Sequence, residues 1–210
     1  MTDVANLSAA DKRALLAKLM KEEAEKNSPS NLPLSFSQHH FWLLEQLLDQ
    51  PGAYNMPVAS CLEGPLNIEA LQASLDAVLQ RHAVLRTSYV EIDDEPTQQI
   101  RDEARFQIEF SDLSTVPETH RDAAARAALE QHAWARFDLE KGACVRALLV
   151  RLKPQTHWLQ ITLHHICADG WSLGILLSEI TALYAFYTGQ TQDRPKELKI
   201  GYADFAIWQR

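Results

Sequence analysis

The 210-residue sequence has few cysteines, no cluster of basic residues and no long apolar run. Cys61, Cys144 and Cys167 are odd in number and lack CxxC spacing, which argues against a disulfide framework and a zinc site. Lys and Arg are dispersed in a chain of formal net charge −8, which disfavours nucleic acid and anionic membranes as partners. Without a basic, apolar leader or a stretch of membrane-span length, we expect a cytoplasmic protein.

Composition and charge divide the chain into two parts. Hydrophobic residues make up 46% of it, enough for a packed core without disulfides. In residues 1–30, Ser8 and Asp11 resemble a capping box that opens a charged amphipathic helix, and a linker follows. This helix fits either a solvated leader or a segment that docks to another protein. Residues 31–210 are expected to form the folded domain.

The second part alternates between helix and strand patterns. Helices are expected over residues 35–48, 68–82, 117–134, 173–187 and 202–210. Strands are expected over residues 56–62, 84–92, 97–101, 106–110, 143–152 and 157–165. The strand at 84–92 is expected to pair with 97–101 and then with 106–110, and the last two strands are expected to form a hairpin. This order predicts an α/β (α+β) fold in which helices flank a mixed β-sheet.

Apolar stripes predict how three of these helices pack. In the first helix, the residues that share one side at three- and four-residue spacing are Phe36, His40, Leu43, Leu44 and Leu47. The second is expected to have Asn67 as its N-cap, and its expected buried stripe is Ile68, Leu71, Leu75, Val78, Leu79 and His82. The helix at 173–187 is apolar on most faces, so we expect it to be well buried.

The stretch LQITLHHICADGWSL, residues 159–173, places two histidines at the end of a predicted strand. Alternation puts His165 on the face of Leu163 and His164 on the opposite face, so the imidazoles do not share one pocket. Asp169 stands where an N-cap is expected for a helix that starts near Gly170. Free N–H groups at that helix N-terminus would stabilise an oxyanion near His165. A possible base and an oxyanion site are therefore expected to be neighbours.

Other interpretations of this stretch remain open from the residues alone. A histidine on an apolar strand face is commonly a core residue, and an aspartate before glycine commonly ends a loop. Cys167 with His165 as partner would make a thiol nucleophile, although no activating environment is evident. A metal site is disfavoured, because the adjacent histidines diverge and no three ligands have a recognisable spacing.

The chain contains, in order, the stretches LSFSQHHFWLLEQL, RHAVLRTSY, LHHICADGWS and YADFAIWQR. These four stretches resemble, in the same order, the motifs of condensation domains in non-ribosomal peptide synthetases. LHHICADGWS resembles the HHxxxDG signature. LSFSQHHFWLLEQL resembles the first motif, a Ser-x-Ala-Gln-x-Arg-Leu-Trp pattern, through Ser35, Ser37, Gln38, Trp42 and Leu44. RHAVLRTSY, residues 81–89, resembles the second motif, and YADFAIWQR, residues 202–210, resembles the fourth.

The sequence departs from these motifs in ways that bear on subtype and length. His40, Ala83 and Tyr89 stand where the family usually has Arg, Glu and Phe, which leaves open whether the donor is L-configured, D-configured or a lipid acyl group. Condensation domains are longer and have two similar lobes, so residues 31–210 resemble the N-terminal lobe only.

The resemblance implies a chloramphenicol acetyltransferase-like lobe with the active site in a tunnel between lobes. The family's catalytic histidine falls on His165, with His164 as structural support. Its aspartate falls on Asp169, in a structural salt bridge with Arg86, and such a pair would be physically reasonable because a buried lone carboxylate is costly. We expect the helix N-terminus at Gly170 to polarise the thioester oxygen.

The implied reaction is amide formation between a carrier-bound thioester donor and the amine of a carrier-bound aminoacyl acceptor. The implied partners are upstream and downstream peptidyl carrier proteins, whose phosphopantetheine arms present the substrates, and the C-terminal lobe. No covalent cofactor and no metal are implied, and the isolated lobe is expected to be inactive. The alternatives are an HxxxDG acyltransferase that uses coenzyme A thioesters, a non-catalytic carrier-protein docking module, and a scaffold.

Overall fold

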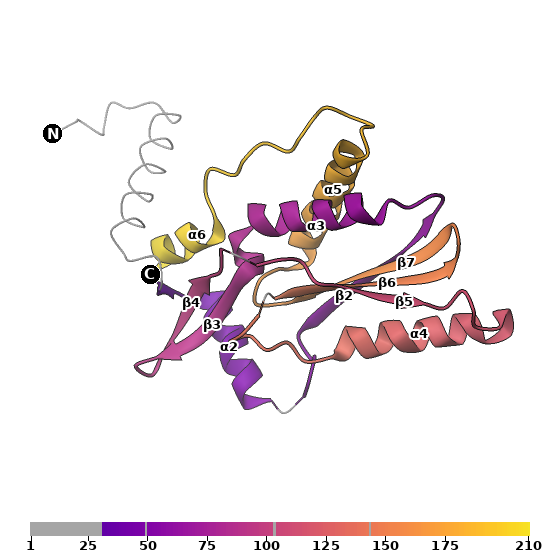
Figure 1. The fold of residues 1–210 in the computed structure, drawn as a ribbon. Coiled ribbons are helices and arrows are strands. Elements are labelled where there is room, and N and C mark those ends of the chain that lie inside the picture. The colour runs from indigo at the N-terminus through magenta and orange to yellow at the C-terminus, as the bar shows by residue number, and fades with distance from the viewer. Residues whose placement is uncertain (1–30, 49, 103, 143) are drawn as a thin grey trace.

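The structure, a computed structural model, describes residues 31–48, 50–102, 104–142 and 144–210. The helix and linker predicted for residues 1–30 lie outside this part. A four-stranded sheet has the order β2-β7-β6-β5, and a three-stranded sheet has the order β1-β4-β3 (Figure 1). The strands are β1 (Leu32–Pro33), β2 (Asn55–Glu63), β3 (Thr87–Ile92), β4 (Glu95–Ile100), β5 (Ile108–Asp112), β6 (Val145–Lys153) and β7 (Thr156–His164).

Helices cover both faces of the four-stranded sheet. On one face α3 (Ile68–Arg81) packs against α5 (Gly170–Tyr187), and α4 (Glu118–Trp134) lies on the opposite face (Figure 1). Beside the smaller sheet lie α2 (Phe36–Leu47), the short 3-10 helix η2 (Ala83–Arg86) and α6 (Tyr202–Gln209). The predicted mixed sheet flanked by helices is therefore confirmed, as is Asn67 as the N-cap of α3.

The two central strands divide their side chains between the helical layers. Leu149 of β6 and Leu163 of β7 belong to the main core shared with α3 and α5. Leu148 and Val150 of β6 pack instead with the α4 layer. Because side chains alternate along a strand, His164 lies on the α4 side, opposite its neighbour Leu163. This alternation fixes the surroundings of the first histidine.

The segment at 106–110 does not pair as its sequence predicts. β5 pairs in parallel with β6 in the four-stranded sheet and does not extend the hairpin of β3 and β4. Side chains of α3 hold Phe106, two residues before β5: Phe106 N–H donates to Asp76 Oδ1 at 2.8 Å, and Gln72 Nε2 donates to Phe106 O at 2.9 Å. The chain then crosses from β5 through α4 to β6, a connection suited to parallel neighbours.

The apolar side of α2 faces outward. The buried residues of this helix are Gln38, Trp42 and Glu45. Leu43 and Leu47, in the predicted apolar stripe, are 40% and 75% exposed. The buried side combines the indole of Trp42, which belongs to the main core, with the polar side chains of Gln38 and Glu45, whose contacts are described below.

The helix α5 is less buried than its composition predicts. Its buried residues are Leu176, Ile180 and Leu183, which form one stripe against the core, whereas Trp171 in its first turn is 83% exposed. Within the described ranges, no helix is both long and apolar enough to cross a membrane. The uncovered side of α5 borders the cleft described in the next section.

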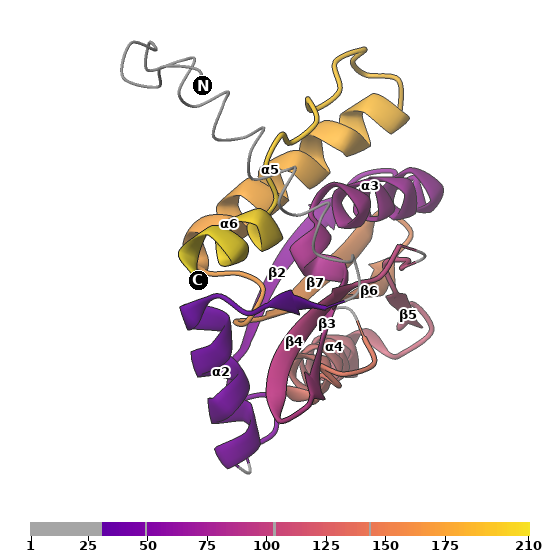
Figure 2. The ribbon, with the colours of Figure 1, turned by 90° about the vertical axis from the view of Figure 1, so that its left-hand side faces the viewer.

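The first and last described segments meet at one corner. Arg210 Nε donates to Leu34 O at 3.0 Å, and Phe36 N–H donates to Gln209 Oε1 at 2.9 Å. The Arg210 guanidinium also lies 5.0 Å from the centre of the Phe36 ring. Figure 2 shows α6 next to the start of α2. These contacts attach α6 to the lobe.

We predict that the turn between α2 and β2 requires glycine at position 52. Gly52 has a φ of +74°, and an added Cβ would lie 2.6 Å from Trp134 O. Gly52→Ala should therefore lower the free energy of unfolding by more than about 1 kcal/mol. Gly64→Ala is the matched control, since Gly64 also has a positive φ but nothing within 4 Å of an added Cβ. Urea denaturation measures both losses, and equal losses would contradict the clash with Trp134.

Candidate active site at the end of β7

The end of β7 buries the first histidine of the pair. His164 is 1% exposed, and Tyr54 and Phe137 meet its ring edge-on with centroids at 6.3 and 6.0 Å. Its Nδ1 accepts a hydrogen bond from Ile166 N–H at 3.1 Å. Because Nδ1 accepts, the neutral ring carries its proton on Nε2.

The Nε2 atom of His164 faces the carboxylate of Glu45. Their separation is 3.5 Å, and Nε2 has no hydrogen-bond partner in the described part of the chain. Burial, together with the charges of His165 and Arg146, lowers the pKa of His164 to about 4, so its contact with Glu45 is not an ion pair near neutral pH. Burial also raises the pKa of Glu45 above its usual value, although Arg136 lies 3.4 Å from its other oxygen.

His165 leaves the strand and reaches a cleft. Its backbone N–H donates to Tyr54 O at 2.9 Å, which continues the pairing of β2 and β7 by one position. Its half-buried side chain lines a cleft of about 690 Å³. The ring stacks on Phe41 of α2, with centroids 4.6 Å apart and planes at 14°. The two imidazoles thus have different surroundings, as strand alternation predicts.

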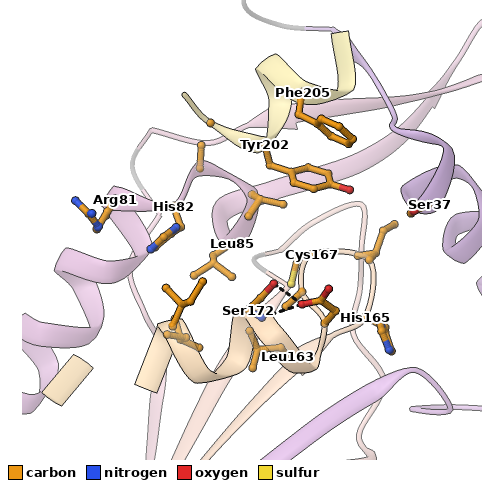
Figure 3. Close-up of a pocket in the computed structure, with 18 of the residues that line it drawn as sticks. Ser37, Arg81, His82, Leu85, Leu163, His165, Cys167, Ser172, Tyr202 and Phe205 are labelled. Carbon is orange, nitrogen blue, oxygen red and sulfur yellow. Dashed lines mark hydrogen bonds between the residues drawn. The ribbon is translucent and has the colours of Figure 1, made fainter. Parts of the chain in front are cut away.

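All four motif stretches contribute to the wall of this cleft. The lining residues from them include Ser37, Phe41, Arg81, His82, Leu85, His165, Asp169, Ser172, Tyr202 and Phe205. Figure 3 shows Arg81 and His82 at one end and His165 at the other, with Tyr202 and Phe205 projecting from α6 above. The sequence stretches are far apart in the chain, yet they converge on one surface.

The end of the cleft remote from His165 is held by a carboxylate. Glu179 of α5 contacts Arg81 Nε through one oxygen at 3.0 Å and His82 Nε2 through the other at 2.6 Å. All three side chains are largely removed from solvent. Their contacts fasten the end of α3 to α5 and so fix this part of the wall.

A chain of hydrogen bonds joins three of the four motif stretches. Ser35 Oγ accepts from Gln38 N–H at 3.2 Å and Gln38 Oε1 accepts from Ser35 N–H at 2.9 Å, which forms a capping box at the start of α2. Gln38 Nε2 donates to Tyr89 OH at 3.0 Å. Ser35 Oγ and Tyr202 OH are also 3.0 Å apart. These bonds hold α2, β3 and α6 together around the cleft.

The predicted salt bridge between Asp169 and Arg86 is wrong. Arg86 Nη1 instead donates to Asp102 Oδ1 at 3.1 Å and to Arg101 O at 2.9 Å. Asp169 is exposed and caps α5, since its Oδ1 accepts from Ser172 N–H at 2.8 Å and from the Ser172 hydroxyl at 2.7 Å. These bonds hold the pKa of Asp169 below its usual value. The Asp169 carboxylate is solvated and already hydrogen-bonded, so it does not need a buried cation to balance its charge. The physical argument for a pair with Arg86 therefore no longer applies.

The helix α5 begins at Gly170, as the sequence predicts. However, the Asp169 carboxylate lies against the same first turn and takes the N–H of Ser172. A negative charge at a helix N-terminus competes with any other anion for that place. The oxyanion role of Gly170 stays a prediction, and an oxygen polarised there would share the turn with Asp169.

The contacts of Cys167 argue against a thiol nucleophile. Cys167 is 8% exposed, and its Sγ lies 3.1 Å from His164 O and 3.4 Å from Cys144 O. The thiol therefore bonds to backbone carbonyls rather than to His165. Among the side chains that the structure describes, no three His, Cys, Asp or Glu residues gather as a set of metal ligands.

The sequence prediction missed the side chains that surround the two histidines. Phe41 and Glu45 come from α2, Tyr54 from the turn before β2, and Phe137 from the segment after α4. The four-residue spacing of Phe41 and Glu45 places both on one side of a helix and was an available signal. A search for apolar stripes misses this pair, because Glu45 is charged and would not be expected on a buried face.

Known proteins resemble this chain over most of its length. The family model described as Condensation domain matches residues 29–210. A linear gramicidin synthase of Brevibacillus parabrevis is 38% identical over 181 residues, which are 86% of this chain and 4% of that protein. The cyclosporin synthetase of Tolypocladium inflatum is 42% identical over 190 residues, which are 90% of this chain and 1% of that protein. This chain therefore spans only a small part of these relatives.

Two solved structures share the fold. The X-domain in its complex with OxyB from teicoplanin biosynthesis has 30% identity and a TM-score of 0.72, over 87% of this chain and 38% of that one. The starter condensation domain of rhizomide synthetase RzmA has 24% identity and a TM-score of 0.71, over 82% of this chain and 41% of that one. This chain therefore spans less than half of either solved chain.

We predict that Asp169 stabilises the fold as a helix cap and not through an ion pair with Arg86. Asp169→Ala should lower the free energy of unfolding by about 1 kcal/mol, because α5 loses its N-cap. Asp169→Asn keeps a capping oxygen without the charge and should retain most of that stability. Chemical denaturation of both variants measures the difference, and an equal loss for Asn and Ala would contradict a capping role.

The low pKa of His164 predicts that acid weakens the fold. The pKa of a histidine in an unfolded chain is about 6.5, whereas the pKa of His164 in the folded chain is about 4. Between these two pH values the unfolded chain therefore binds more protons than the folded chain. Neutral His164 contributes its full stabilisation above about pH 6.5. As the pH falls from there toward 4, the free energy of unfolding should decrease by about 3 kcal/mol.

Denaturation curves at several pH values test this prediction against His164→Gln. Burial lowers the pKa of His132 and His157 as well, so both proteins should lose some stability in acid. The Gln variant should lose less between pH 6.5 and pH 4. Identical losses in the two proteins would rule out His164 as the cause.

Proposed function

Because the chain belongs to the condensation-domain family, we propose that residues 31–210 form the N-terminal lobe of a synthetase condensation domain and supply its catalytic histidine. The fold is that of a chloramphenicol acetyltransferase-like lobe. The observation that carries the proposal is the position of His165, at the end of β7 in a cleft walled by all four motif stretches. His164, buried beside it, supports the strand end.

The proposed reaction forms an amide bond. The amine nitrogen of the acceptor attacks the thioester carbonyl carbon of the donor, the carbon–sulfur bond breaks, and the amine proton ends on the departing thiolate. An α-amino group has a reference pKa of about 7.7 to 8.0, so part of it is neutral near pH 7.

Orientation is the larger contribution expected of His165. General-base assistance is worth about 10² to 10⁴ in rate, whereas orienting two reactants reaches effective molarities of about 10⁵ to 10⁸ M. In the proposed mechanism His165 holds the amine toward the thioester and accepts its proton as the tetrahedral intermediate forms. The proposed hydrogen-bond donor to the thioester oxygen is the backbone N–H of Gly170. The Asp169 carboxylate in the same turn makes this position less favourable for a second negative charge.

The proposed partners are two carrier proteins and a second lobe. The cleft is open on one side, apolar for most of its lining, and offers the hydroxyls of Ser37, Ser172 and Tyr202. Such a surface suits the long, amide-containing phosphopantetheine arm that a carrier presents, and the arm would supply the thioester. The other wall of the tunnel is assigned to the C-terminal lobe.

A second candidate function is a non-catalytic docking module. The X-domain, which has been solved as a complex with OxyB, shares 30% identity with this chain. In such a module the cleft would bind a partner, and the imidazole of His165 would have no chemical role. The two functions therefore differ in what His165→Ala does.

We predict that His165→Ala, made in the complete synthetase, abolishes amide formation or lowers its rate at least about 100-fold, while the melting temperature stays within a few degrees. His120→Ala is the matched control, because His120 is an exposed histidine of α4 on the opposite side of the sheet. Peptide output by mass spectrometry is the measurement. Full output from the His165 variant would favour the docking module.

A companion experiment tests the need for the second lobe. Residues 31–210 should show no condensation alone and regain it when joined to a C-terminal lobe. Activity of the fragment by itself would contradict a shared tunnel.

A further inference from the structure

The contact between His165 and Phe41 differs from the other aromatic contacts of the two histidines. The rings are stacked, with centroids 4.6 Å apart and planes at 14°. Tyr54 and Phe137 meet His164 edge-on instead, at angles of 65° and 84°. A stacked ring covers one whole face of the imidazole and leaves its edge, with both nitrogens, uncovered.

In the described part of the chain, no hydrogen bond or ion pair orients the ring of His165. Among all described side chains and carbonyls, none makes a hydrogen bond with its Nδ1 or Nε2, whereas its backbone N–H is bound to Tyr54 O at 2.9 Å. A reactive histidine is commonly fixed by a hydrogen bond on its second nitrogen. Here the backbone is anchored, and the rotation of the side chain is left to packing. Phe41 is the aromatic residue in contact with the ring.

Phe41 is itself held in place. Its ring meets Tyr54 edge-on at 5.5 Å and packs against the main core, with Trp42 beside it in the buried face of α2. The capping box of Ser35 and Gln38 fixes the first turn of the same helix. The helix therefore presents Phe41 to the cleft at a defined position.

We propose that Phe41 is a positioning residue, whose stacked ring holds the imidazole of His165 in one orientation where it lines the cleft. The proposal rests on the proposed role of His165 and deepens it. Leucine, which stands at this place in the Ser-x-Ala-Gln-x-Arg-Leu-Trp pattern, fills similar space but has no face to stack. In this chain the aromatic ring takes over the orientation that a hydrogen bond would otherwise provide.

Kinetics of the complete synthetase test the functional part. Phe41→Leu should lower kcat about tenfold or more with KM changed less than about twofold, since a misoriented reactive group costs rate rather than binding. Phe41→Tyr keeps the stacking ring and should retain kcat within about threefold. Leu43→Ala, on the outward side of α2, is the control and should behave as wild type. Wild-type kcat in Phe41→Leu, or an equal fall in the Tyr variant, would overturn the proposal.

Nuclear magnetic resonance of this 210-residue chain tests the geometry without any activity. The ring current of Phe41 should move the carbon-bound ring protons of His165 upfield, and Phe41→Leu should abolish that shift while most backbone amide resonances stay in place. Unshifted His165 protons in the wild-type chain would overturn the stacked geometry. If His165→Ala leaves the synthetase active while the ring-current shift is present, the proposed function fails and the stacking stands.

Discussion

The site depends on keeping one imidazole out of water. Burying a polar ring costs free energy unless its polar atoms are bonded, and an imidazolium would cost far more. His164 stays neutral and has Nδ1 bound to Ile166 N–H, while Nε2 faces the Glu45 carboxylate at 3.5 Å without a hydrogen bond in the described part of the chain. Because neighbouring side chains diverge, fixing His164 inside sends His165 to the cleft.

The wall of the cleft depends on polar groups inside the fold. Ser35 and Gln38 cap the start of a helix and at the same time reach Tyr202 and Tyr89. Tyr89 stands where condensation domains usually have phenylalanine, and burial raises the pKa of its phenol well above the usual value, so it remains a neutral partner for Gln38. Tyr89, which departs from the motif, therefore takes part in the hydrogen bonds that hold the lobe together.

Local signals predicted much of the fold, and contacts between distant segments account for what they missed. The caps at Asn67 and Asp169 and the hairpin of β6 and β7 follow from neighbouring residues, and these predictions are confirmed. The pairing of β5 was wrong because hydrogen bonds from α3 redirect the chain before it. In the candidate site, alternation along β7 predicted the opposite directions of the two histidines. The assignment of Arg86 to Asp169 was wrong, because it rested on resemblance and on an assumed burial of Asp169.

The corner where α6 meets the start of α2 has a mechanical consequence. Arg210 and Gln209 are bonded to the backbone of Leu34 and Phe36, so the two ends of the described fold lie at neighbouring points. Each of these segments is therefore held by the other, so that unwinding of the end of α6 would also release the start of α2.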